Sequence, residues 1–335
     1  DLIYQLVHEN KYCFLSRPRR FGKSLLVTTL QAYFQGKKEL FKGLAIDSLE
    51  TEWTAYPVLH FDISKGKYYS LANLMSTLNV VISPYECLYG LTPDKSDDFN
   101  VRIINIIQAA KQQTGKNVVV LIDEYDCPMH DSMKDEKLQE QIRDIMRNFF
   151  SPLKSEEDNL QFVFMTGISK FSQLSIFSEL NNITNISMEN EYSSICGISK
   201  EELLEDFHDD IEDLAKAQNM TFDEAVAQLK FHYDGYHFSG NGADMFNPYS
   251  LLNTFRLNKF NSYWFSTGTP TFLIELLKQK GIDMLQMEDI WTNSDRFDTP
   301  TKKITDPIPV LYQSGYLTIK DYIDMQTLTS SPSLT

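Results

Sequence analysis

The amino-acid sequence predicts a doubly wound α/β domain with a parallel sheet, followed by a mostly helical domain. Short apolar runs alternate with amphipathic segments through the first part of the chain, which is the pattern of strands joined by helices. The run VVVLI, 118–122, precedes two carboxylates and is typical of a strand buried on both faces of a parallel sheet. The pattern changes after about residue 198, where Ser199 and Thr221 each stand three residues before a glutamate, as in a helix capping box.

The α/β domain is expected to cover residues 1–197, with helices between its strands. Strands are predicted at 12–15, 57–64, 117–126, 161–167 and 182–188, and helices at 1–9, 25–34, 70–85, 101–113 and 135–150.

The mostly helical domain is expected over residues 198–322. Helices are predicted at 199–219, 221–233, 248–257 and 269–279. The segment PVLYQSGYLTIKDY, 309–322, alternates and turns at Gly315, which predicts a β-hairpin. Residues 323–335 are mainly polar and are predicted to form a disordered tail.

The charge of the chain disfavours nucleic acid as its partner. The 335 residues include 46 acidic and 31 basic side chains, for a net charge of −15. Most of this surface would repel a polyanion. The length and the 42% hydrophobic content are sufficient for a sizeable buried core.

The cysteines and the absence of long apolar runs predict a cytoplasmic protein without membrane contact. The four cysteines are far apart and form no C-x-x-C pair, so we expect reduced thiols. No run is long enough to span a bilayer, and no signal peptide is visible. The chain opens without Met inside a predicted helix, so we expect a further N-terminal segment to precede Asp1.

The segment SRPRRFGKS, 16–24, lies between a predicted strand and a predicted amphipathic helix, which is the context of a phosphate-binding loop. Lys23 is placed to reach β- and γ-phosphates, and Ser24 to bind Mg²⁺ through its hydroxyl. Gly22 stands where the backbone must come closest to a ligand, and the helix N-terminus favours an anion. A Gly-Lys-Ser tripeptide also occurs in surface turns, but the flanking elements favour a nucleotide site.

Three arginines distinguish this loop. Arg17 replaces the first glycine of the usual pattern, and Arg19 and Arg20 add two more cations. They are either ordinary surface charge or a supplementary clamp on phosphate. The predicted nucleotide-binding set is Arg17, Arg19, Arg20, Phe21, Gly22, Lys23, Ser24 and Leu25.

The run VVVLIDE provides the second half of the predicted site. A Mg²⁺-dependent nucleotide hydrolase needs a carboxylate at the end of a buried strand to hold the metal, and Asp123 fits that need. Glu124 follows immediately and is the candidate for orienting or activating the attacking water. Such a strand can also end in solvated acids, but the two motifs together, each closing a strand, favour a nucleotide site.

The strand QFVFMTG adds a third element at its end. Thr166 is placed to sense the γ-phosphate or position the water beside Glu124, and Ser169 or Lys170 to contact nucleotide or a partner subunit. An ordinary hydroxyl-rich turn is an equally good interpretation of this segment.

The chain resembles the AAA-ATPase-like family through FLSRPRRFGKSLL, LIDEYD, TGISKFS, SIFSELNNITNIS, YDGYHF and YWFSTGTPTFLIELL. The resemblance implies an additional-strand P-loop NTPase core of the RecA/AAA type, then a helical, winged-helix-like segment, with ATP as the nucleotide. It matches Lys23, Ser24, Asp123 and Glu124 to the family's functional positions, and Thr166 less closely. Many members carry a C-terminal PD-(D/E)xK nuclease-like domain, which we do not expect in this chain.

The predicted function is Mg²⁺-dependent ATP binding and hydrolysis. Lys23, Glu124 and Thr166 would be catalytic, and Ser24 and Asp123 would hold the metal. One of Arg17, Arg19, Arg20 or Lys170 would offset charge in the transition state. The alternative is a nucleotide-gated switch with negligible turnover alone, acting through a homo-oligomer or an effector protein; a third possibility is a structural scaffold that keeps the loop.

Overall fold

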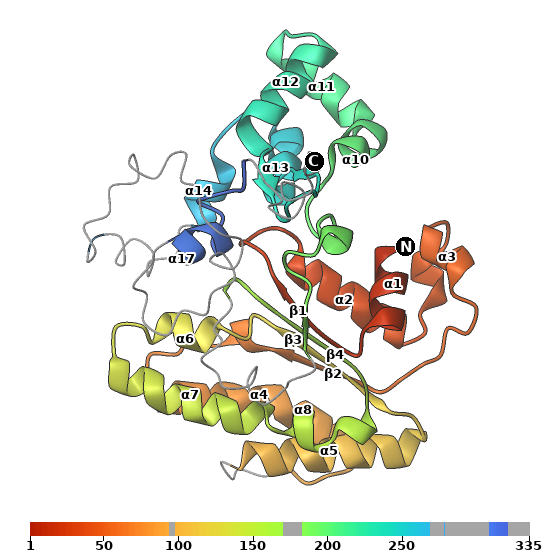
Figure 1. The fold of residues 1–335 in the computed structure, drawn as a ribbon, viewed down its shortest axis with the longest axis vertical. Coiled ribbons are helices and arrows are strands. Elements are labelled where there is room, and N and C mark those ends of the chain that lie inside the picture. The colour runs from red at the N-terminus through yellow and green to blue at the C-terminus, as the bar shows by residue number, and fades with distance from the viewer. Residues whose placement is uncertain (94–97, 170–182, 269–277, 279–307, 321–335) are drawn as a thin grey trace, which may run out of the picture. The chain divides into compact units, whose positions relative to one another are not determined.

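The computed structural model describes residues 1–93, 98–169, 183–268, 278 and 308–320, as drawn in Figure 1. The chain divides into two compact units, Asp1–Ile186 with Gly268–Tyr316 and Ser187–Thr267 with Leu317–Thr335. The first unit thus includes a segment from the C-terminal part of the sequence. A contiguous division into 1–197 and 198–322 stays a prediction.

A five-stranded parallel sheet organises the first unit. Its strands are β1 (Tyr12–Ser16), β2 (Val58–Asp62), β3 (Val118–Asp123), β4 (Leu160–Gly167) and β5 (Thr184–Asn185). They lie in the order β2-β3-β4-β1-β5, and every neighbouring pair is parallel. The strand β4 lies between β1 and β3. The five predicted strands and their parallel arrangement are confirmed, but β5 covers only two of the residues predicted at 182–188, and β3 ends at Asp123, three residues before the predicted end.

Helices cover both faces of this sheet. The helices described in this unit are α1 (Leu2–Glu9), α2 (Lys23–Phe34), α3 (Ala45–Leu49), α4 (Leu71–Leu88), α5 (Phe99–Thr114), α6 (Cys127–Asp131), α7 (Glu136–Phe150), α8 (Pro152–Ser155) and α17 (Ile308–Gln313), with short 3₁₀ turns η1 (Lys38–Phe41), η2 (Ile63–Lys65) and η3 (Glu157–Asn159). In Figure 1, α2 lies on one face, and α4, α5 and α7 lie on the other. No helix in the described ranges is both long and apolar enough to cross a membrane.

The central strand β3 is buried on both faces, as its apolar run predicts. All six of its residues are buried. Val118, Val120 and Ile122 belong to the core that also contains residues of α4, α5 and α7. Because side chains alternate along a strand, Val119 and Leu121 point to the face covered by α2. A strand in this position can place its last residues at the edge of the sheet with little freedom to move.

The second unit is mostly helical in its described part. It contains α10 (Lys200–Asp206), α11 (His208–Gln218), α12 (Phe222–Tyr233), α13 (Pro248–Leu257), most of α14 (Tyr263–Gly268), the 3₁₀ turn η4 (Asn190–Tyr192) and a short antiparallel pair, β6 (Tyr236–His237) and β7 (Asp244–Met245). Ser199 and Thr221 form the predicted capping boxes with Glu202 and Glu224. The β6–β7 pair is an addition to the sequence prediction.

The predicted hairpin over 309–322 is wrong in its first arm. Residues Ile308–Gln313 form the helix α17, and all six are buried. Short buried apolar runs do not show by pattern alone whether they are helix or strand, and Pro309 suits the first turn of a helix. The predicted turn is present, since Gly315 has φ +83°. The helix predicted at 269–279 lies outside the described residues except for Lys278, and the predicted tail lies outside them entirely.

Candidate active site at the carboxyl edge of the sheet

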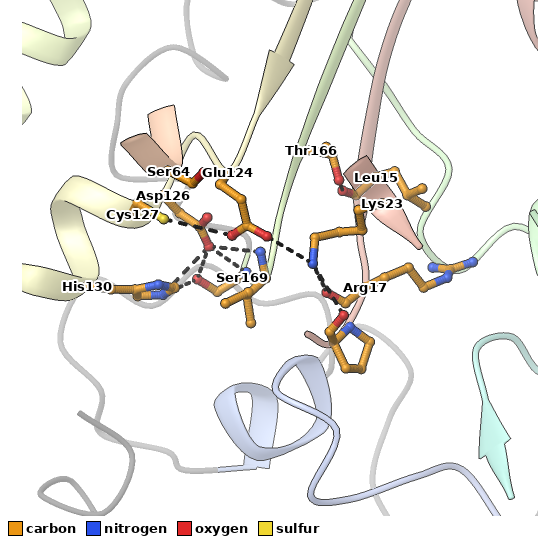
Figure 2. Close-up of polar contacts among 12 residues, drawn as sticks. Leu15, Arg17, Lys23, Ser64, Glu124, Asp126, Cys127, His130, Thr166 and Ser169 are labelled. Carbon is orange, nitrogen blue, oxygen red and sulfur yellow. Dashed lines mark hydrogen bonds and ion pairs between the residues drawn. The ribbon is translucent and has the colours of Figure 1, made fainter. Parts of the chain in front are cut away.

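The register of the sheet brings the predicted site residues to one edge. Asp62, the last residue of β2, is the partner of Asp123 on β3, and Leu15 of β1 is the partner of Thr166 on β4. The chain leaves β1 at Ser16 and enters α2 at Lys23. Residues far apart in the sequence therefore meet where four strands end, and Figure 2 shows Lys23, Glu124 and Thr166 at this edge.

The loop from β1 to α2 turns through left-handed backbone conformations. Gly22 has φ +93° and is the N-cap of α2, and Arg20 has φ +68°. A Cβ added at Gly22 would meet no protein atom within 4 Å, so glycine is needed here for its backbone angle and not for space. The turn directs the first N–H groups of α2, which have no partner inside the helix, toward the edge of the sheet.

Lys23 is the buried cation of the site. The residue is 4% exposed. Its ammonium donates to the carbonyl oxygens of Arg17 at 3.1 Å and Pro18 at 3.2 Å, and it lies 3.3 Å from Glu124 Oε1. An ammonium has three N–H donors, and two of them are engaged by the carbonyls of its own loop. Lys23 therefore fastens its own loop and pairs with the acidic residue predicted to orient water.

Glu124 occupies a strained position directly after β3. Its φ of +52° is uncommon for a residue with a side chain, and such a conformation costs about 1–3 kcal/mol. The turn is held by hydrogen bonds from Tyr125 N to the Thr166 carbonyl and from Cys127 N to the Glu124 carbonyl, both at 3.1 Å. The second carboxylate oxygen accepts from the Cys127 thiol at 3.8 Å. The surrounding loop thus fixes the direction in which the carboxylate points.

Asp123 is a buried carboxylate with one unpartnered oxygen. The residue is 4% exposed, and its Oδ1 has no hydrogen-bond partner among the described residues. Burial raises its pKa to about 6, and a hydrogen bond from Ser24 opposes that shift. A buried acceptor without a partner is costly unless a cation or donor satisfies it.

The residues around Asp123 fit a magnesium ion. Ser24 is exposed beside the buried carboxylate, so a hydroxyl and a carboxylate oxygen face the same edge. No group of three or more His, Cys, Asp or Glu side chains that could hold a metal exists within the described part of the chain. That is compatible with Mg²⁺, which is usually held by one or two carboxylates together with substrate phosphates and water.

The other predicted residues differ in their access to this edge. Arg17 is 1% exposed; its guanidinium donates to the Ser16 carbonyl at 3.0 Å, and in Figure 2 its side chain extends away from Lys23. Arg19 is half-buried and Arg20 is exposed. Phe21 is buried in the interior, and Leu25 is 71% exposed at the start of α2.

The hydroxyl of Thr166 faces the neighbouring strand. It is buried and donates to the Leu15 carbonyl at 2.8 Å. Its oxygen can still accept a hydrogen bond. Lys170, the other residue predicted near this strand end, lies outside the described residues.

A polar cluster that the sequence analysis missed lies beside Glu124. Asp126, His130 and Ser169 contact one another in the interior, as Figure 2 shows. Burial lowers the pKa of His130 to about 3, so its imidazole is neutral at physiological pH. Asp126 and His130 lie one helical turn apart, but that spacing alone is too common to identify a site.

Comparison with known proteins gives two similarities. A family model for predicted AAA-ATPases matches residues 1–177. A protein described as "Uncharacterized protein in vnfD 5'region" from Azotobacter chroococcum mcd 1 is 32% identical over 316 residues. That alignment covers 94% of this chain and 58% of the relative, so the chain spans a little over half of the relative's length.

Proposed function

The chain belongs to the predicted AAA-ATPase family, and from this membership and the geometry of the site we propose that it binds ATP with Mg²⁺ and hydrolyses it. The observation that carries the proposal is the pairing of Lys23 with Glu124 at 3.3 Å, beside the buried Asp123. These residues come from different loops and meet at the edge of a parallel sheet, where such folds bind ligands.

Phosphate binding is assigned to Lys23 and the N-terminus of α2. The ammonium is shielded from water, which strengthens its interaction with an anion. A phosphate group placed here would compete with the Glu124 carboxylate for the same N–H donors. We therefore propose that nucleotide binding releases Glu124 from Lys23.

The metal is assigned to Ser24 and Asp123. Bound Mg²⁺ would neutralise charge on the β- and γ-phosphate oxygens. Asp123 must be ionised for this role. With a pKa of about 6, its carboxylate is mostly ionised at neutral pH despite its burial.

Water activation is assigned to Glu124 and Thr166. Once released from Lys23, the Glu124 carboxylate can accept a proton from a water. The Thr166 proton is held by the Leu15 carbonyl, so its oxygen would orient that water as an acceptor and would not donate to phosphate. Arg17, Arg19, Arg20 or Lys170 would then offset transition-state charge.

A nucleotide-gated switch is the second candidate. The observation in its favour is that Lys23 is ion-paired with Glu124 while two of its ammonium donors are held by the carbonyls of its own loop. Such a site can remain inactive until nucleotide and a partner rearrange it. A second copy of the chain or an effector protein would then supply an arginine, as partners do for other nucleotide hydrolases.

ATP binding can be tested with a fluorescent ATP analogue and Mg²⁺, using the wild type and Lys23→Ala. Loss of charge-assisted hydrogen bonds of roughly 1.5–3 kcal/mol each should weaken binding about tenfold to a hundredfold. Lys11→Ala is the matched control, because that ammonium donates to the Glu157 carbonyl at the opposite end of β1. Equal binding by all three proteins, or by none, would refute the site.

Turnover per molecule, measured over a range of protein concentrations, separates the two candidates. A constant rate would indicate a self-sufficient ATPase. A rate that rises with concentration would indicate a site completed by assembly. Binding without turnover at every concentration would leave the switch as the function.

A further inference from the structure

We propose that Asp126 is a positioning residue, which couples the end of β4 to Glu124 so that the two loops act as one unit. The proposal rests on the proposed ATPase function, for which Glu124 orients water. Asp126 is fully buried, and it follows Glu124 by two residues in the loop after β3. It does not itself reach the edge of the sheet where the substrate would bind.

One oxygen of Asp126 holds the chain that leaves β4. Its Oδ2 accepts hydrogen bonds from the Ile168 amide at 3.0 Å, the Ser169 amide at 2.8 Å and the Ser169 hydroxyl at 3.0 Å. The two amides lie just beyond the last paired residue of β4, Gly167, which is aligned with Ser16. The carboxylate therefore accepts the hydrogen bonds that the carbonyl groups of a neighbouring strand would accept within the sheet.

Every polar group of Ser169 is bound by the segment that follows β3. Its amide and hydroxyl donate to Asp126, its carbonyl accepts from the Tyr125 hydroxyl at 2.9 Å, and its hydroxyl oxygen contacts His130 Nε2 at 2.9 Å. Here three side chains from one segment hold a single serine.

The burial and contacts of Ser169 do not suit a serine nucleophile. With Asp126 ionised, the single hydroxyl proton of Ser169 goes to that carboxylate, and His130 then donates from Nε2 to the serine oxygen. A nitrogen that carries a proton cannot accept one from Ser169. Ser169 is also 3% exposed. The cluster is therefore built to hold a loop, and it does not match the Ser-His-Asp arrangement of hydrolases.

Gly167 allows the carboxylate to approach the backbone. A Cβ at this position would lie 2.5 Å from Asp126 Oδ1 and 2.8 Å from Tyr125 Cδ1. Gly167 is not among the glycines with positive φ, so the requirement is for space. The close fit means that Asp126 cannot shift without displacing the end of β4.

The same segment also fixes Glu124. Tyr125 N donates to the Thr166 carbonyl at 3.1 Å, next to the positive-φ backbone of Glu124. Tyr125 thus connects the Glu124 turn to Thr166, and Asp126 holds the two residues that follow the end of β4. Without these contacts, the strained turn can relax and the carboxylate can leave its position.

The test is single-turnover ATP hydrolysis, with protein in excess, by the wild type, Asp126→Asn, Ser169→Ala and Gly167→Ala. Misplacement of a catalytic group by about 1 Å costs on the order of a hundredfold in rate. We expect Asp126→Asn to lower the rate by about that factor, with ATP affinity changed less than about threefold, because the phosphate and metal ligands are intact. Gly167→Ala should act in the same direction by pushing the carboxylate away.

Ser169→Ala decides the question if Asp126→Asn fails to fold. It removes the contacts of the hydroxyl and keeps the hydrogen bond from the residue 169 amide to Asp126, so we expect a smaller loss of rate with unchanged ATP affinity. The matched control is Ser132→Ala, another buried serine, whose hydroxyl donates to the carbonyls of Pro128 and Met129 in its own helical segment. Thermal melting of each variant accompanies the rates, and Ser132→Ala should keep the wild-type rate.

A double variant tests whether Asp126 acts through Glu124. If Asp126 acts by positioning Glu124, adding Asp126→Asn to Glu124→Gln should lower the rate no further. Independent, multiplying losses would overturn the proposal, as would a wild-type rate in folded Asp126→Asn or Ser169→Ala. A wild type that binds no ATP, or binds it without single turnover, would instead refute the ATPase function and this inference with it.

Discussion

The Lys23 ammonium lies 3.3 Å from the Glu124 carboxylate, in an ion pair whose side chains are only 3% and 18% exposed. The pair connects the loop after β1 with the loop after β3, although β4 separates these strands in the sheet. The group proposed to hold phosphate and the group proposed to orient water therefore neutralise each other. Binding and turnover should respond differently when one partner is changed.

Glu124→Gln should separate ATP binding from hydrolysis. The amide has nearly the same shape but no charge, so Lys23 is freed for phosphate, and ATP affinity should be unchanged or up to about tenfold higher. Turnover should fall by about 10²–10⁴-fold, as on removal of a general base. Equilibrium titration and single-turnover rates measure the two effects; ATP binding tenfold weaker than wild type would contradict the competition for Lys23.

The buried Asp123 should make stability depend on pH. Its pKa is raised from 3.8 to about 6 by burial, so between pH 6 and 4 the folded state takes up a proton before the unfolded state does. Stability from this group therefore increases as pH falls through that range, and at pH 8 the ionised carboxylate costs the fold about 3 kcal/mol. Affinity for Mg²⁺ should change in the opposite direction, because protonation removes the ligand.

The variant Asp123→Asn tests the direction of this pH dependence of stability directly. In urea unfolding without Mg²⁺ at pH 8, the variant should be more stable than the wild type, and the difference should shrink toward pH 4. Asp144→Asn is the control, because that aspartate is exposed and pairs with Arg147 on the surface of α7. An Asp123→Asn protein less stable than the wild type at pH 8 would show that the carboxylate is not destabilising.

Local sequence patterns were enough to predict the strands and the site residues at the ends of those strands. The apolar runs predicted β1 to β4, and the residues at or after the ends of these strands included Lys23, Asp123 and Glu124. Strand order was less accessible, because alternation of strands and helices predicts a parallel sheet without saying which strands are neighbours. The position of β4 between β1 and β3 was not predicted and comes from the structure.

The Asp126–Ser169 contact could not be found from local pattern. Its residues are 43 apart in sequence and meet only because β3 and β4 are neighbours in a particular register. The Lys23–Glu124 pair was missed for the same reason, although both residues were identified. The helix α17 was missed because a short buried apolar run fits either a helix or a strand.

Gly22→Ala should affect both stability and ATP binding. The left-handed angle of +93° is unfavourable for alanine, at about 1–2 kcal/mol, and relaxing it would move the loop amides away from phosphate. Gly43 is the matched control, since its φ is +84° and it too has no atom within 4 Å of an added Cβ. Gly43→Ala should cost similar stability in urea unfolding with normal ATP affinity. Equal ATP affinity in both variants would argue against phosphate binding by the loop backbone.

The buried pair Glu86–Arg102 should be the most sensitive polar contact between α4 and α5. Arg102 donates from Nε and Nη2 to the two carboxylate oxygens at 2.8 and 2.9 Å, with both side chains at most 3% exposed. Glu86→Ala leaves the buried guanidinium with its hydrogen bond to Asn79 but without its carboxylate, so urea unfolding should show a loss of about 3–5 kcal/mol. The exposed pair Asp144–Arg147 is the comparison, and Asp144→Ala should cost less than about 1 kcal/mol.

A second variant separates the charge from the packing at that position. Replacing both partners, Glu86→Leu with Arg102→Met, removes the uncompensated charge and keeps apolar volume between the helices. Such replacements are often neutral or stabilising, so the double variant should recover most of the loss seen in Glu86→Ala. If it is as unstable as the single variant, the ion pair itself, and not the avoidance of a lone buried charge, stabilises the contact of α4 with α5.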